Sequence, residues 1–171
     1  MLIDELGALY AEVWWKHDAK DFTGVKRAYT RICQLLGHSK EAGQIAEHVA
    51  KAYKYSDEAE KQPEYYEKAL DEMLIVRRAL NQDDRISQAQ IGWWKAFRSK
   101  NYASAAYYVL KQQVIMAGSI GINTLLAAYY FIRSGISHDK RDQKRTSKWL
   151  SKYWGCIIAQ HDSKKQVPLP I

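Results

Sequence analysis

Arg133 and His138 lie five positions apart, between a very apolar stretch of the chain and a strongly basic one. A histidine transfers protons near neutral pH, and an arginine stabilises an anionic phosphorane through its N–H donors. This pair of residue types suits metal-independent cleavage of a phosphodiester, so Arg133 and His138 are the candidate catalytic residues. The alternative hypothesis gives His138 a helix-capping role at the surface and no part in catalysis.

The segment from Arg133 to His138 resembles the Arg-x4-6-His motif of HEPN ribonucleases. The resemblance implies metal-independent RNA cleavage at a dimeric site, with the histidine and the arginine acting on the scissile phosphate. Ser134 stands where that family usually has an asparagine.

Six cations recur at three- and four-residue spacing just after this motif: Lys140, Arg141, Lys144, Arg145, Lys148 and Lys152. On a helix this spacing gathers them on one side, whereas Trp149 and Tyr153 lie on another. Only Asp139 and Asp142 offset their charge, although a purely solvated helix face more often alternates acidic and basic residues. We therefore expect these six residues, called the basic stripe below, to contact the phosphates of a nucleic acid.

The net positive charge of the chain comes from its second half. Residues 1–84 contain 12 Lys and Arg against 16 Asp and Glu, whereas residues 85–171 contain 14 against 3. The aromatic residues are mostly Tyr (12) and Trp (6), which suit interfaces and base stacking. The expected partners are RNA or a guide–target duplex together with other protein subunits. A helical adaptor that binds only proteins is an alternative.

Motifs for other chemistry are absent from the sequence. It has no Gly-rich phosphate loop, no His-Glu-x-x-His and no zinc-type cluster, so we expect no cofactor, no metal site and no small-molecule substrate. Cys33 and Cys156 stand far apart without an adjacent base, which favours two core thiols. Such sparse cysteine usage, with an acidic N-terminus unlike a signal peptide, predicts a reduced, cytoplasmic protein.

Apolar residues recur at helical spacing nearly throughout, which predicts an all-α, single-domain helical bundle of about seven to eight helices. We expect an acidic helical half over residues 1–84, a basic helical half of the same domain over 85–161, and an extended, loosely held tail over 162–171. Asp21 and Asn101 are candidate N-caps, and Ser137 is a candidate N-cap for a long last helix that ends near Ala159.

The stretch from Val114 to Ile132 has no charged residue and approaches the length of a membrane-spanning helix. Because Gly118 and Gly121 interrupt it, we expect a break between two buried helices and no membrane contact. The second of them, Ile122 to Ile132, is apolar on nearly every side, which places it in the centre of the bundle.

Residues 101–155 resemble the small helical subunit of type III-B CRISPR effector complexes. The likeness is carried by Tyr102-Ala103-Ser104, Val114-Ile115-Met116, Gly121-Ile122, Leu125-Leu126-Ala127 and Trp149-Leu150, whereas Ile120 replaces the family's asparagine. The resemblance implies a non-catalytic subunit of a ribonucleoprotein involved in antiviral defence, which lines a guide–target duplex with basic helix faces. This function is the first hypothesis, and a HEPN-like ribonuclease or toxin is the second.

Overall fold

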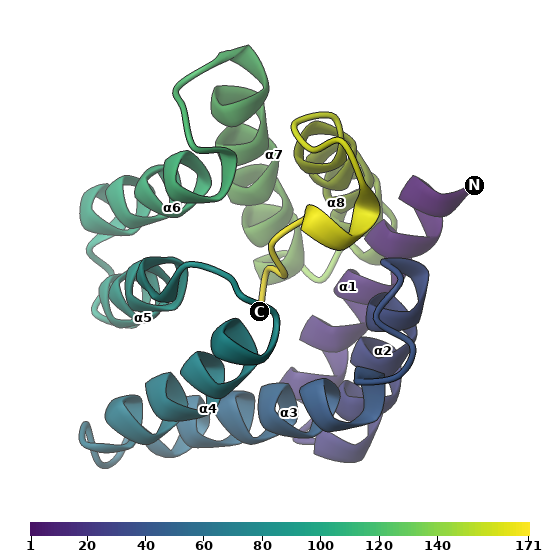
Figure 1. The fold of residues 1–171 in the computed structure, drawn as a ribbon. Coiled ribbons are helices and arrows are strands. Elements are labelled where there is room, and N and C mark those ends of the chain that lie inside the picture. The colour runs from purple at the N-terminus through teal and green to yellow at the C-terminus, as the bar shows by residue number, and fades with distance from the viewer.

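The computed structural model describes all 171 residues and confirms the prediction of an all-α protein. Its elements are α1 (Leu2–Asp18), α2 (Phe22–Leu35), α3 (Ala42–Glu58), α4 (Tyr65–Ala79), α5 (Asp84–Arg98), α6 (Tyr102–Ala117), α7 (Ile122–Asp139), α8 (Gln143–Ile158) and the short 3₁₀ helix η1 (Lys164–Gln166). Each α-helix packs against its neighbours in sequence, and α8 also packs against α1, so the eight helices form a closed ring (Figure 1).

Two close contacts between α1 and α8 complete the ring. A Cβ atom added at Gly7 would lie 2.5 Å from the backbone nitrogen of Ser151, so only glycine lets the two helices approach this closely. Further along the same pair, the rings of Tyr10 and Trp154 pack edge to face with centroids 6.0 Å apart.

The second four helices repeat the spacing of the first four. α2 begins at Phe22 and α6 at Tyr102, while α3 begins at Ala42 and α7 at Ile122, so each pair of starts is separated by 80 residues. The turns before α2, α6 and α8 share one design, in which a cation with positive φ precedes the capping residue: Lys20-Asp21, Lys100-Asn101 and Arg141-Asp142. Asp21 and Asn101 accept hydrogen bonds from Gly24 N and Ser104 N, which confirms both predicted caps.

The boundary between the last two helices was predicted wrongly. α7 continues through Ser134 and Gly135 to Asp139, and the cap of α8 is Asp142 instead of Ser137. The Ser134 hydroxyl donates to the Phe131 carbonyl and the Ser137 hydroxyl to the Arg133 carbonyl. These bonds satisfy both hydroxyls within the helix, so neither serine interrupts it.

The expected central position of Ile122 to Ile132 is also wrong. A closed ring gives every helix an inner and an outer face, and the inner face of α7 carries mainly small residues such as Ala127 and Ser134. Ile122, Leu125 and Ile132 point outward and are 71%, 48% and 36% exposed. The chain therefore leaves a large apolar surface on α7 uncovered.

Residues 167–171, the central segment below, occupy the middle of the ring instead (Figure 1). The segment is extended, as predicted. The prediction that it is loosely held is wrong, because Val167, Leu169 and Ile171 are at most 1% exposed. Hydroxyl groups of the surrounding helices bind its backbone: Tyr29 donates to the Pro170 carbonyl at 3.0 Å and Tyr10 to the Ile171 carbonyl at 3.0 Å.

A fully buried arginine borders the central segment. Arg77 donates through Nε to the Ser87 hydroxyl and through Nη1 to Gln82 Oε1 at 2.8 Å. The same Gln82 oxygen accepts from the backbone N–H of Leu169, so one amide joins the guanidinium to the central segment. Burial lowers the pKa of Arg77 to about 10, which still leaves the group charged at neutral pH.

The break predicted between α6 and α7 is confirmed, since α6 ends at Ala117 and Gly118 adopts a φ of +73°. No helix here has both the length and the apolar character that crossing a membrane requires.

The burial of the central segment predicts a large effect of one side chain. Leu169→Ala is expected to lower the free energy of unfolding by about 2–5 kcal/mol, because it leaves a cavity in the middle of the ring. Urea denaturation measures the change. Ile75→Ala, at a 43% exposed position on α4, is the matched control and is expected to cost less than about 1 kcal/mol. Equal losses in the two variants would contradict the central position of Leu169.

Candidate nucleic-acid interface

The six cations of the basic stripe are all exposed, in the α7–α8 turn and along the outer face of α8. The opposite face of α8 packs into the core through Thr146, Leu150, Tyr153, Trp154 and Ile157. This burial fixes the rotation of α8, so Lys144, Lys148 and Lys152 point to solvent one turn apart. The predicted grouping on one helix face is present for Lys144, Arg145, Lys148 and Lys152, whereas Lys140 and Arg141 lie in the turn before α8.

The basic stripe lacks the ion pairs found elsewhere on this chain. In the first half, cations such as Lys26 and Arg31 lie within 3 Å of the carboxylates of Glu47 and Glu5. On the stripe only Arg145 has a carboxylate partner, at 3.3 Å from Asp142. Five of its six positive charges are thus not neutralised by the protein, which leaves them available to an external polyanion.

Next to the stripe, aromatic rings and cations form a cluster that the sequence analysis did not predict. The rings of Tyr130 on α7 and Trp149 on α8 stack with centroids 5.8 Å apart and an interplanar angle of 21°. The Arg133 guanidinium lies 5.3 Å from the Trp149 centroid and the Lys152 ammonium 4.9 Å from it. We call Tyr130, Arg133, Trp149 and Lys152 the aromatic–cation cluster. Its signals in the sequence were the three-residue spacings of Tyr130 and Arg133 and of Trp149 and Lys152.

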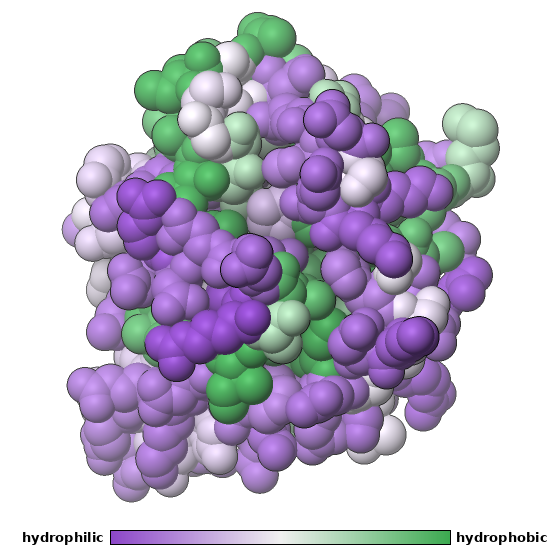
Figure 2. Space-filling model, viewed as in Figure 1, coloured by the Kyte–Doolittle hydropathy of each residue, from purple (hydrophilic) through white to green (hydrophobic).

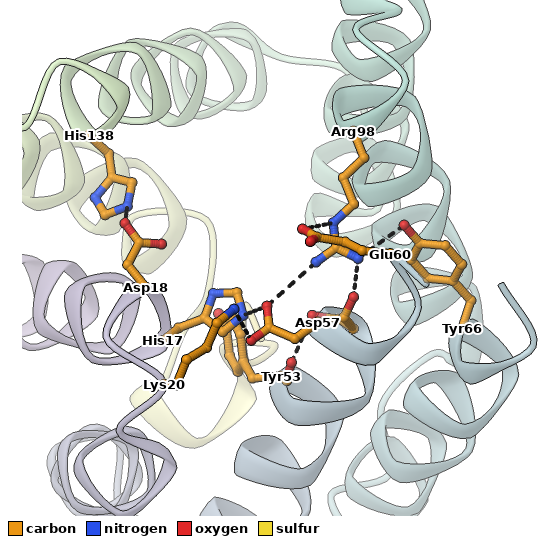
Figure 3. A network of polar contacts seen from close by, with 10 residues as sticks. His17, Asp18, Lys20, Tyr53, Asp57, Glu60, Tyr66, Arg98 and His138 are labelled. Atoms are coloured by element: carbon orange, nitrogen blue, oxygen red, sulfur yellow. Dashed lines mark hydrogen bonds and ion pairs between the residues drawn. The ribbon is translucent and has the colours of Figure 1, made fainter. Parts of the chain in front are cut away.

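Arg133 and His138, the candidate catalytic pair, have different neighbours. While Arg133 lies over Trp149, the His138 imidazole packs 4.2 Å from the Trp15 ring on α1, and its Nε2 lies 2.9 Å from Asp18 Oδ2 (Figure 3). Five residues along a helix correspond to a rotation of about 140°, which accounts for the separation. His138 also lies in the last turn of α7 and does not cap the following helix.

A second polar cluster joins α1, α3 and α5 at one end of the ring (Figure 3). Asp57 on α3 accepts from His17 Nε2 at 2.8 Å, pairs with Lys20, and lies 3.8 Å from Arg98 Nη2. Arg98 in turn pairs with Glu60 at 3.5 Å and donates to the Tyr66 hydroxyl. Because the charges of this cluster are paired within the protein, we assign it a structural role in joining the helices.

The expectation of two core thiols holds for Cys33, whereas Cys156 packs against the edge of the core. Cys33 is fully buried, and burial raises the pKa of its thiol to about 12. Cys156 is partly buried, and burial raises its pKa as well. Neither thiol therefore forms a reactive thiolate readily at neutral pH.

Comparison with protein-family models, curated proteins and solved structures found no match to this chain.

The ion pairs of Asp57 predict how stability depends on pH. Burial raises the pKa of this carboxyl, but hydrogen bonds from His17 and Lys20 outweigh it, so the pKa lies below its usual value. A lowered pKa stabilises the fold above the unfolded-state pKa, and this contribution is lost as the pH falls through the folded-state value. Asp57→Asn is therefore expected to cost about 1–3 kcal/mol at pH 7 and progressively less below about pH 4.

Urea denaturation of both proteins between pH 3 and 7 measures this difference. Asp71→Asn, which changes an exposed carboxylate without an ion pair, is the control and is expected to change stability little at any pH. A loss for Asp57→Asn that stays constant over the whole range would contradict the assignment.

Proposed function

We propose that this protein binds RNA without cleaving it, through the basic stripe and the adjoining aromatic–cation cluster of α7 and α8. The observation that carries the proposal is the row of exposed cations without carboxylate partners, which leads directly to the stacked rings of Tyr130 and Trp149. Unneutralised cations supply affinity for phosphates, and aromatic rings supply stacking for bases.

The two parts of the surface act on different parts of the ligand. Lys144 and Lys148 lie one turn apart on the stripe and contact successive phosphates of the backbone. Trp149 and Tyr130 form a short stack that an unpaired base extends, with Arg133 and Lys152 holding the adjacent phosphates. Because bases within a duplex are already stacked on one another, this arrangement favours single-stranded RNA.

A binding role also accounts for the residues that a ribonuclease would use. Arg133 lies over Trp149 and His138 is held against Asp18, so the two side chains do not converge on one phosphate. The resemblance of residues 101–155 to a CRISPR small subunit supports a place in a larger ribonucleoprotein. In such a complex the acidic half, residues 1–84, contacts other protein subunits.

The first test removes charge from the stripe. Lys144→Ala with Lys148→Ala is expected to weaken binding of single-stranded RNA and to lower the slope of log K against log salt by about one per lost phosphate contact. Fluorescence anisotropy at several salt concentrations measures both quantities. Lys40→Ala with Lys54→Ala removes two exposed, unpaired lysines from the first half and is expected to change neither.

Two outcomes would contradict the proposal. One is an RNA affinity that does not depend on salt, which would favour the protein-binding adaptor. The other is metal-independent RNA cleavage by the wild type that is lost in both Arg133→Ala and His138→Ala, which would favour the ribonuclease.

The second test removes the stacking ring without changing charge. Trp149→Leu is expected to weaken single-stranded RNA binding by about 5- to 150-fold, which corresponds to the free energy of stacking one base. The slope of log K against log salt is expected to stay unchanged, because no charge is removed. Trp149→Phe, which keeps an aromatic ring, is expected to lose much less. Affinity that is equal in the leucine and phenylalanine variants would show that Trp149 does not stack on a base.

A further inference from the structure

The outer face of α7 carries five large apolar residues at alternating spacings of three and four: Ile122, Leu125, Tyr129, Ile132 and Ile136. We call this row the α7 seam. The exposed fraction of its members runs from 36% at Ile132 to 71% at Ile122. A three-and-four spacing places side chains in one line that a second helix covers in a coiled coil.

The α7 seam is the centre of a larger apolar area. Of the 13 large hydrophobic residues that are exposed on this chain, nine lie between Tyr102 and Ile136. Figure 2 shows hydrophobic residues gathered at the top of the view, over the connection between α6 and α7. A group of exposed apolar side chains on one face is typical of a protein–protein interface.

Charge distinguishes this face from the rest of the molecule. Residues 101–136 contain only two charged side chains, Lys111 and Arg133, although the whole chain has a net charge of +7. Two copies of such a basic protein repel one another through most of their surfaces, and the α6–α7 face is where this repulsion is least. It can therefore meet an identical face.

The order of residues along the seam is self-complementary. Read in either direction, it has isoleucine at both ends, a branched aliphatic residue next to each end, and Tyr129 in the middle. An antiparallel second copy would place Ile122 against Ile136, Leu125 against Ile132, and Tyr129 against its own counterpart. This matching is what an interface with two-fold symmetry requires.

We propose that two copies of this protein associate through antiparallel packing of their α7 seams. The inference does not depend on RNA binding. In the dimer the two basic stripes lie on either side of the paired α7 helices, because α8 packs beside α7 in each copy.

The first experiment measures the molar mass by sedimentation equilibrium at 10–100 µM protein, and the expected value is twice the chain mass of 19.8 kDa. Leu125→Glu with Ile132→Glu is expected to give a monomer with unchanged helical circular dichroism, because both positions are exposed in the single chain. Ile75→Glu, an equally exposed apolar position on α4, is the control and is expected to remain dimeric. A monomeric wild type at 100 µM, or a double variant that stays dimeric, would overturn the proposal.

The second experiment tests the antiparallel arrangement. In a chain with Cys156→Ser, Tyr129→Cys is expected to form a covalent dimer on mild oxidation, since the residue faces its own counterpart across the axis. Ile75→Cys is expected to remain monomeric under the same treatment. Failure of Tyr129→Cys to cross-link would overturn the arrangement.

Salt separates this proposal from the proposed function. Raising the salt concentration weakens RNA binding, because phosphate contacts release counterions. The same change is expected to leave the dimer intact or to strengthen it, because screening reduces repulsion between two basic chains and the seam itself is uncharged. A dimer that dissociates as salt rises would show that charged residues, not the α7 seam, hold the two copies together.

Discussion

Filling the centre of the ring is the constraint on which the rest of this structure depends. Eight helices that pack mainly against their ring neighbours enclose a middle in which residues 167–171 are buried. This segment has no regular secondary structure, so its backbone groups need side-chain partners. Tyr10, Tyr29 and Gln90 bind its carbonyl groups, and Gln82 binds one of its N–H groups.

Local features of the fold could be predicted from the sequence, because they depend on residues close together in the chain. The caps at Asp21 and Asn101 are of this kind. Long-range features were harder to predict. The sequence from Val167 to Ile171 has the composition of a loose end, and only the closed ring gives it a place to be buried. Likewise, the pattern of Ile122 to Ile132 indicates an apolar helix but not which surface covers it.

The candidate site shows the same difference between local features, which could be predicted, and long-range contacts, which could not. The four cations of the basic stripe that lie on α8 could be identified from their spacing within one helix. The stacking of Trp149 on Tyr130 joins two helices, so spacing within one helix does not reveal it. The separation of Arg133 from His138 is a consequence of helix geometry, which becomes clear only once both are known to lie in α7.

The two halves of the chain differ in charge and also in how many of their cations form ion pairs within the protein. The first half pairs many of its cations with its own carboxylates, and these pairs join neighbouring helices such as α2 and α3 through Lys26 and Glu47. In the second half, carboxylates are few, and every cation of the basic stripe except Arg145 lacks a carboxylate partner, while the neighbouring α7 exposes the apolar α7 seam. α7 and α8 thus carry, next to one another, the basic stripe and the α7 seam, the two surfaces for which the chain itself supplies no partner.

Closure of the ring by α1 and α8 has a consequence for synthesis of the chain. α1 ends at Asp18, and its partner α8 begins only at Gln143. At a translation rate of 5–20 residues per second, the α8-binding side of α1 waits roughly 6–25 s for its partner to be synthesised. During that time Tyr10 lacks the contact with Trp154. Nascent chains of this protein therefore carry an exposed aromatic surface near the N-terminus, which makes them candidates for chaperone binding before they leave the ribosome.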